Sequence, residues 1–145
     1  MNKPPLLFPP ILLALLTCLL TGCMGTSEIK EGPVYPPSVK RGTTLDIQVV
    51  RSGTRIELTN TTARTFGKSK LWVNGRFARD IDGLAVGQTL NLSLKDFTNE
   101  FGYPYRAGGF FATQKSDRLV LAEIQPLDAT PPEMIGLIVV GGGEE

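Results

Sequence analysis

The residues best suited to chemistry in this sequence are four carboxylates near its middle. Asp80 and Asp82 stand two residues apart after an expected strand, and Asp96 or Glu100 could join them. Such a group offers the oxygen ligands that Ca²⁺ takes. Paired carboxylates also serve glycosidases, but those enzymes need a long cleft, for which a domain of this size leaves little room. We therefore interpret the four as solvated carboxylates of turns.

The other groups that usually carry catalysis are scarce. The 145 residues contain no histidine and two cysteines, so the commonest general base is missing and the usual zinc ligands are too few. The glycines of residues 103–109 do not follow a strand and open a helix, as a phosphate-binding loop requires. We expect no enzyme activity, no cofactor and no metal.

One cysteine stands in a context that suggests attachment of lipid. Residues 11–20 form an apolar stretch whose length lies within the roughly 7 to 15 residues of a signal peptide and below the ~20 that cross a bilayer as a helix. Leu20 is the last residue of this stretch, and Thr21, Gly22 and Cys23 follow it directly. This run resembles the lipobox of bacterial lipoproteins, which implies cleavage before Cys23 and acylation of its thiol. An ordinary secretory signal and a retained membrane helix are the alternatives.

The lipobox resemblance also implies a location. A chain acylated at Cys23 is anchored to a membrane of the bacterial cell envelope, and Met24 favours the outer membrane where the organism has two membranes. Cleavage removes Lys3 and Cys18, which leaves 14 Lys plus Arg against 14 Asp plus Glu. Because this balance gives no strongly basic chain, we expect no nucleic-acid partner.

Composition divides the chain into four parts. Residues 1–22 are the expected signal peptide, and residues 23–42, rich in glycine and proline, are the expected acylated N-terminus and flexible linker. Residues 43–125 alternate apolar and polar side chains and form the expected folded domain. Residues 126–145 are the expected C-terminal extension, with an additional edge strand over residues 134–140 and a soluble tail.

The alternation predicts an all-β fold, a single antiparallel sandwich of about seven strands. Asn74 and Gly75 predict a two-residue hairpin turn, because both tolerate a positive φ. A second hairpin is predicted around residues 115–118. The expected strands lie within residues 45–49, 56–58, 70–73, 76–81, 90–94, 110–114 and 119–124.

A set of turn and core positions carries a further resemblance. The positions are residues 56–60, Leu71, Val73, Asn74, Gly75, Leu84, Gly87, Leu92, Phe97 and Gly102. Together they resemble small immunoglobulin-like sandwich modules of bacterial secreted proteins. The resemblance implies the general sandwich architecture, without the cysteine pair of antibody domains, and it implies no particular function.

The hairpin around residue 74 carries the first candidate binding surface. A two-residue turn would place Trp72 opposite Phe77 on one face. Lys70 and Arg79 would frame this aromatic pair. If the other, aliphatic face is inward, the pair lies outside and can contact a protein or a sugar. The alternative, in which Trp72 and Phe77 belong to the core, stays open at this stage.

A second candidate surface is the loop that contains Tyr103 and Tyr105. With Phe101 and Arg106 these rings could stack on a saccharide or dock a partner, or they could close the end of the sandwich. The last interpretation is the simpler one. We keep both tyrosines in the candidate surface.

Three functional hypotheses follow from these observations. The favoured one is a membrane-tethered structural or protein-interaction module of the cell envelope, bound to the membrane through the lipid on Cys23. The second is a module that binds cell-wall polysaccharide. The third, a small hydrolase, would depend on Asp80 or Asp82.

Overall fold

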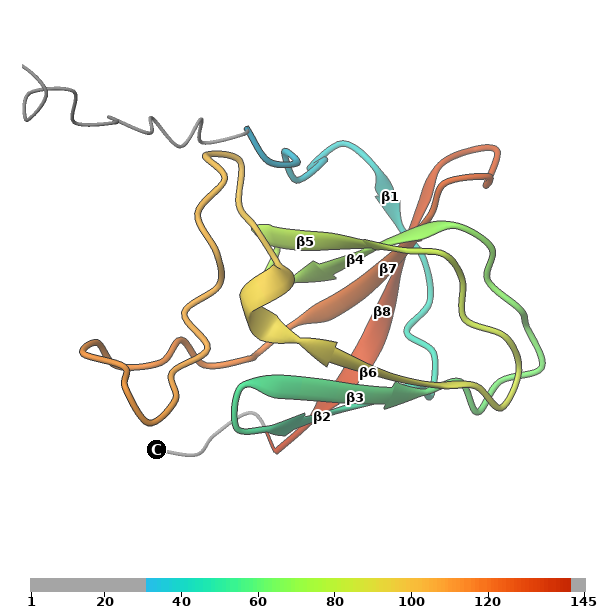
Figure 1. Cartoon of the computed structure of the whole chain (residues 1–145). Helices are drawn as coiled ribbons and strands as arrows, with labels where there is room; N and C mark the ends of the chain where they lie inside the picture. The colour runs from blue at the N-terminus through green and yellow to red at the C-terminus, as the bar shows by residue number, and fades with distance from the viewer. Residues whose placement is uncertain (1–30, 142–145) are drawn as a thin grey trace, which may run out of the picture.

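The structure, a computed structural model, describes residues 31–141 and is built from short strands and one short helix (Figure 1). The prediction of an all-β fold is confirmed. The predicted signal peptide and the predicted acylation of Cys23 fall on residues outside those that the structure describes. The elements are β1 (Lys40–Arg41), β2 (Gln48–Ser52), β3 (Arg55–Thr59), β4 (Ser69–Val73), β5 (Phe77–Ile81), β6 (Thr89–Ser93), the 3₁₀ helix η1 (Leu94–Asp96), β7 (Ala122–Pro126) and β8 (Glu133–Val140).

The strands form one curled sheet in the order β5-β4-β7-β8-β2-β3-β6, with β1 also paired to β8. The pairings of β8 with β1 and β2 are parallel, and the other pairings are antiparallel. The sheet is therefore mixed, and the prediction of a purely antiparallel sheet is wrong. The immunoglobulin-like sandwich is not confirmed. Among the described residues, no helix has the length and apolar character needed to cross a membrane.

Strand β8 makes the sheet curl because its two halves have different neighbours. Ile135 pairs with Ile124 of β7, whereas Val139 pairs with Val49 of β2. The half of the sheet with β4 and β5 consequently lies over the half with β3 and β6 (Figure 1). The expected edge strand over residues 134–140 is thus a central strand. Its alternating side chains Ile135, Leu137 and Val139 contribute to the core, and an edge position would leave more of this apolar surface in water.

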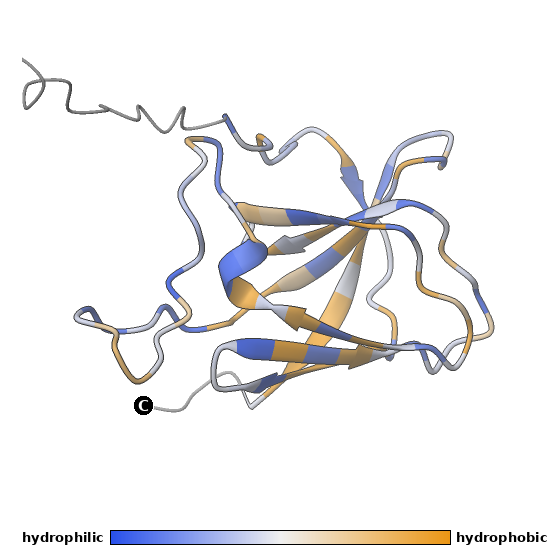
Figure 2. Cartoon of the chain, viewed as in Figure 1, coloured by the Kyte–Doolittle hydropathy of each residue, from blue (hydrophilic) through white to orange (hydrophobic). Residues whose placement is uncertain are grey.

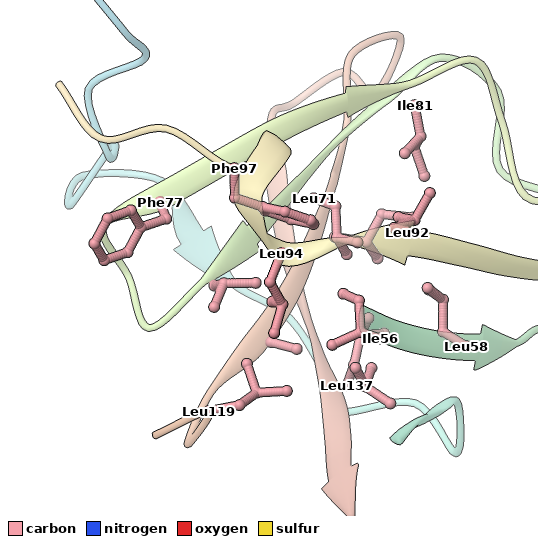
Figure 3. Close-up of a cluster of buried hydrophobic side chains, with 14 of the residues drawn as sticks. Ile56, Leu58, Leu71, Phe77, Ile81, Leu92, Leu94, Phe97, Leu119 and Leu137 are labelled. Atoms are coloured by element: carbon pink, nitrogen blue, oxygen red, sulfur yellow. The ribbon is translucent and has the colours of Figure 1, made fainter. Parts of the chain in front are cut away.

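The main core fills the space between the two halves of the sheet. Figure 2 shows alternating hydrophobic and hydrophilic residues along β3, the pattern of a strand with one buried face. Ile56 and Leu58 of β3 pack beside Leu92 of the neighbouring β6 and point toward Leu71 of β4 in the opposite half (Figure 3). All of these side chains are buried.

A second, smaller cluster lies on the other face of β4 and β5. Trp72 and Ala78 are buried there together with Met134, beneath Tyr35 and Val39 of the N-terminal segment. The predicted flexible linker over residues 23–42 therefore does not extend to residue 42. Its last part is folded, because its apolar side chains cover Trp72 and its backbone pairs with β8.

The hairpin between β4 and β5 has a different register from the predicted one. Asn74 and Gly75 do adopt positive φ values of 54° and 61°, and Arg76 N donates to Val73 O at 3.2 Å. Val73 is nevertheless paired with Phe77, so Arg76 is an extra residue in the turn. A shift of one residue moves Phe77 to the opposite face. The shift buries Phe77 in the main core and leaves the charged Arg76 in water.

The second predicted hairpin does not form. Residues 110–114 contain no strand, and the strand that follows begins at Ala122 rather than at residue 119. The connection from η1 to β7 is instead a long loop. Phe110 and Phe111 are adjacent and both exposed, which does not fit the alternation that a half-buried strand requires.

Candidate functional site

Three segments that are distant in sequence enclose a hollow of about 650 Å³ on the surface. They are the turn between β4 and β5, the loop after η1 and the segment that precedes β7. We call the site the arginine hollow, after three of its residues. Its lining consists of Asn74, Arg76, Phe77, Asn99, Tyr103, Pro104, Arg106, Asp117 and Arg118.

Two asparagine side chains hold these segments together. Asn74 Nδ2 donates to Arg118 O at 2.7 Å, and Asn74 Oδ1 accepts from the backbone amides of Val120 and Leu121 at 2.9 and 3.2 Å. The buried Asn99 accepts from Tyr103 N at 2.9 Å. Since these bonds satisfy backbone groups that no strand pairs, they fix the loops around the hollow.

The hollow has an excess of positive charge. Arg106 forms a two-pronged ion pair with Asp117, in which Nη2 lies 2.6 Å from Oδ1 and Nε lies 3.2 Å from Oδ2. The hydrogen bond to Asp117 raises the pKa of Arg106 above its ordinary value. Arg76 Nε lies 3.8 Å from a carboxylate oxygen of Glu100, and Arg118 has no ion-pair partner within residues 31–141. Three guanidinium groups thus face the hollow, with Asp117 as the only acid in the lining.

Aromatic rings complete the lining. Phe77 packs edge-on against Tyr105, with ring centroids 5.2 Å apart, and the guanidinium of Arg76 lies 5.6 Å from the centroid of the Phe77 ring. Tyr103 is more than half exposed. The hollow therefore offers guanidinium donors for an anionic group and one open ring for an apolar or planar group beside it.

Of the predicted surface residues, the structure brings only Tyr103 to this hollow as an exposed ring. Trp72, Phe77 and Tyr105 are buried, so they do not form the exposed aromatic patch. Trp72 and Phe77 lie on opposite faces because Arg76 shifts the register. The alternative in which both rings belong to the core is therefore correct, with Phe77 in the main core and Trp72 in the second cluster.

The two cations expected to frame that patch are also separated. Lys70 forms an ion pair with Asp80, and Arg79 Nη1 lies 2.7 Å from Asp96 Oδ2. Lys70 shares the face of Trp72, and Arg79 shares the face of Phe77, because side chains alternate along a strand. The cations thus neutralise carboxylates.

The carboxylates considered for calcium are engaged in the same way. Asp80, Asp96 and Glu100 each lie beside a different cation. Within the part of the chain that the structure describes, no three His, Cys, Asp or Glu side chains are grouped so that they could hold a metal ion. The arrangement of Asp80 and Asp82 therefore gives no support to a metal site.

Arg76 and Arg118 are the functional candidates that sequence reasoning missed. They lie far apart in the sequence, and their approach depends on the folding of the long loop after η1. Only the neighbourhood of Tyr103 and Arg106 gave a local signal. Comparisons with known proteins found no family model, no curated protein and no solved structure that matches this chain.

Proposed function

We propose that this chain is a non-catalytic interaction module of the bacterial cell envelope, anchored by lipid on Cys23, that binds an acidic segment of a partner protein in the arginine hollow. The observation that carries the proposal is the convergence of Arg76, Arg106 and Arg118 around one exposed tyrosine. Arginine and tyrosine are the residue types that dominate the energetic centres of protein interfaces. Guanidinium groups also match the planar geometry of carboxylates.

The lipid anchor is part of the same proposal and rests on the sequence around Cys23. It would hold the module at a membrane of the envelope, with the outer membrane favoured where the organism has two membranes. A partner in that compartment would meet the hollow at a high effective concentration, since both would be confined near one surface. An interaction of modest intrinsic affinity would then be enough.

We also propose an immunoglobulin-like arrangement for the domain. In such domains one sheet contains strands C′, C, F and G, and the other contains A, B and E. The order β5-β4-β7-β8 followed by β2-β3-β6 corresponds to this scheme if β8 is strand G and β2 is strand A. This correspondence supports a scaffold that presents loops, and it names no ligand.

A second candidate function is the binding of an acidic cell-wall polysaccharide. The exposed ring of Tyr103 favours it, because an aromatic face beside arginines can stack on a sugar while the cations hold its carboxylate. The two functions differ in the polymer that carries the negative charge, so one experiment can compare them.

The test measures binding of the full chain to poly-glutamate, as the acidic peptide, and to polygalacturonate, as the acidic polysaccharide. We expect Arg118→Gln and Arg76→Gln each to weaken the binding of poly-glutamate by about tenfold, the value of a lost charge-assisted hydrogen bond. Arg55→Gln is the matched control, because Arg55 is an exposed arginine that bonds to Asn91 away from the hollow. Equal binding by the three variants and the parent would contradict the proposal. Preference for polygalacturonate, lost with Tyr103→Ala, would favour the second function.

A further inference from the structure

The long loop from η1 to β7 carries an exposed pair of phenylalanines at its tip. Phe110 and Phe111 have 96% and 90% of their surface accessible, more than any other large hydrophobic residue within residues 31–141. Their rings pack edge-on against each other, with centroids 5.0 Å apart. We call this pair the diphenylalanine tip. Apolar surface left in water at one point of a soluble fold usually marks a contact site.

The tip is carried by a hydrogen-bonded stem, which consists of residues 105–109 on the outgoing side of the loop and residues 116–119 on the returning side. Arg51 donates to Asp117 O at 2.6 Å and to Ala107 O at 2.8 Å, so one guanidinium joins the outgoing and the returning side of the stem. Tyr105 Oη donates to Asp117 O at 2.7 Å, and the buried Leu119 fixes the returning chain in the main core. The exposure of the tip is therefore imposed by the stem.

Glycines direct the chain away from the body of the domain just before the tip. Gly108 and Gly109 have φ values of 79° and 120°, which other residues rarely adopt. A Cβ at residue 108 would lie 2.9 Å from the Cβ of Ser116 across the stem. The stem can be this narrow only because residue 108 is glycine, and the result is a convex projection.

The charge around the tip is positive. Lys115 is exposed on the returning side of the loop and the guanidinium of Arg51 lies in the stem, while the carboxylate of Asp117 is occupied by Arg106. A convex apolar pair beside cations matches an anionic lipid surface, where the rings enter the interface and the cations remain at the headgroups. A protein partner would need a pocket for two adjacent rings, and nothing in the charge pattern requires one.

We propose that the diphenylalanine tip inserts into the interfacial region of a membrane rich in anionic lipid. This contact is separate from the acyl anchor and from binding in the arginine hollow. The same loop starts beside the first described residues, where Gly32 N donates to Glu100 O at 3.1 Å, and its tip projects at the lower left in Figure 1.

The test places a tryptophan at the tip of the full chain, reconstituted into vesicles of brominated phosphatidylcholine with or without brominated phosphatidylglycerol. Bromine quenches only a tryptophan that enters the bilayer. We expect the emission added by Phe111→Trp to fall by at least about twofold in the anionic vesicles and less in the neutral ones. The native Trp72 is buried and serves as a constant background.

Val86→Trp is the matched control. Val86 is also exposed, but it lies in the loop between β5 and β6, at the opposite end of the molecule in Figure 1. Its emission should not change in either kind of vesicle. Lys115→Glu should reduce the quenching of Trp at residue 111 in anionic vesicles without unfolding the exposed loop.

Two outcomes would overturn the inference. One is quenching at residue 111 that does not exceed quenching at residue 86 in anionic vesicles. The other is protection of residue 111 from aqueous acrylamide by solubilised envelope proteins but not by vesicles, which would assign the tip to a protein partner. Acrylamide quenching in solution first verifies that both introduced tryptophans are exposed.

Discussion

Glu123 is the residue on which the second, outer cluster depends most directly. Its side chain is buried on β7 and accepts a hydrogen bond from Tyr35 Oη at 2.7 Å, while Arg41 Nε lies 3.3 Å from its other oxygen. The ring of Tyr35 stands edge-on to Trp72, whose Nε1 donates to Gln125 Oε1 at 2.9 Å. One carboxylate therefore ties the N-terminal segment to the sheet, and both partners come from that segment.

The first prediction concerns this carboxylate. We expect Glu123→Gln to lower the free energy of unfolding by about 1–3 kcal/mol, since a buried charge-assisted bond is weakened. The loss stays in this range because Arg41 is largely exposed and its charge can return to water. The loss in the free energy of unfolding is measured by unfolding in urea. Glu57→Gln, on the exposed side of β3, is the control, and an equal effect of the two substitutions would show that Glu123 has no special role.

The second prediction concerns alkaline pH. Burial raises the pKa of Tyr35 and of Tyr105 above the ordinary 10.0, against the lowering effects of Arg41 and Arg51 respectively. The folded state therefore favours the neutral phenols, and their contribution to stability is complete below pH 10 and is lost as pH rises through the higher folded values. The difference between the free energies of unfolding at pH 9 and pH 11 should be smaller in Tyr35→Phe and in Tyr105→Phe than in the parent chain. An unchanged difference in both variants would contradict this assignment.

At the scale of elements, the segment that includes β1 has the role of a cover. Tyr35 and Val39 lie over Trp72 on the outer face of the sheet, and β1 pairs in parallel with the start of β8. The ring of Tyr35 also lies against Gly75 in the hairpin turn, where a Cβ would meet it at 3.8 Å. A segment rich in proline can fold in this way because it needs only a few anchoring side chains and two strand pairings.

The third prediction tests this cover through the only tryptophan. In the parent chain, Trp72 emission should be insensitive to acrylamide because the indole is buried. Replacing Tyr35 and Val39 together by alanine should expose it to quenching and lower the free energy of unfolding by about 1–3 kcal/mol. Val34→Ala, at an exposed position of the same segment, should change neither quantity. An indole that is accessible already in the parent chain would rule out the cover.

At the scale of the whole molecule, β8 joins the two halves of the sheet. Its first half pairs with β7 and its second half with β2, and Ile138 N, at the change of neighbour, donates to Ile47 O at 3.0 Å. The last strand of the chain therefore closes the fold around the main core. A chain shortened before β8 would leave β7 and β2 without their shared neighbour.

The fourth prediction follows from this position. Ile138→Pro removes the backbone donor and should lower the free energy of unfolding by about 3 kcal/mol or more. Ile138→Ala keeps the donor and truncates a side chain that is exposed, so its effect should be much smaller. Thermal unfolding of the two variants separates the backbone from the side chain. A similar loss in both would mean that the parallel pairing with β2 does not hold the two halves together.

Local features of this fold can be predicted from the sequence, whereas features that depend on pairing between segments cannot. The strand around Ile56 and Leu58 and the turn at Asn74 and Gly75 are readable from the sequence, because alternation and positive φ are local properties. The face of the sheet on which Phe77 lies is not readable from the sequence, since one extra residue in the turn moves the side chain from one face to the other. Two consecutive aromatics after two glycines were the available signal that residues 110–114 are not a strand.

The sequence by itself determined the all-β class, most strand positions, the main hairpin turn and the scarcity of catalytic groups, since each follows from residue type or short-range spacing. The tertiary structure decided which face of β4 lies inward, the central place of β8, the folding of the N-terminal segment over Trp72 and the assembly of the arginine hollow. These features depend on contacts between segments far apart in the chain. No local pattern specifies them, because they are set by which pairing buries the most apolar surface while leaving charges in water.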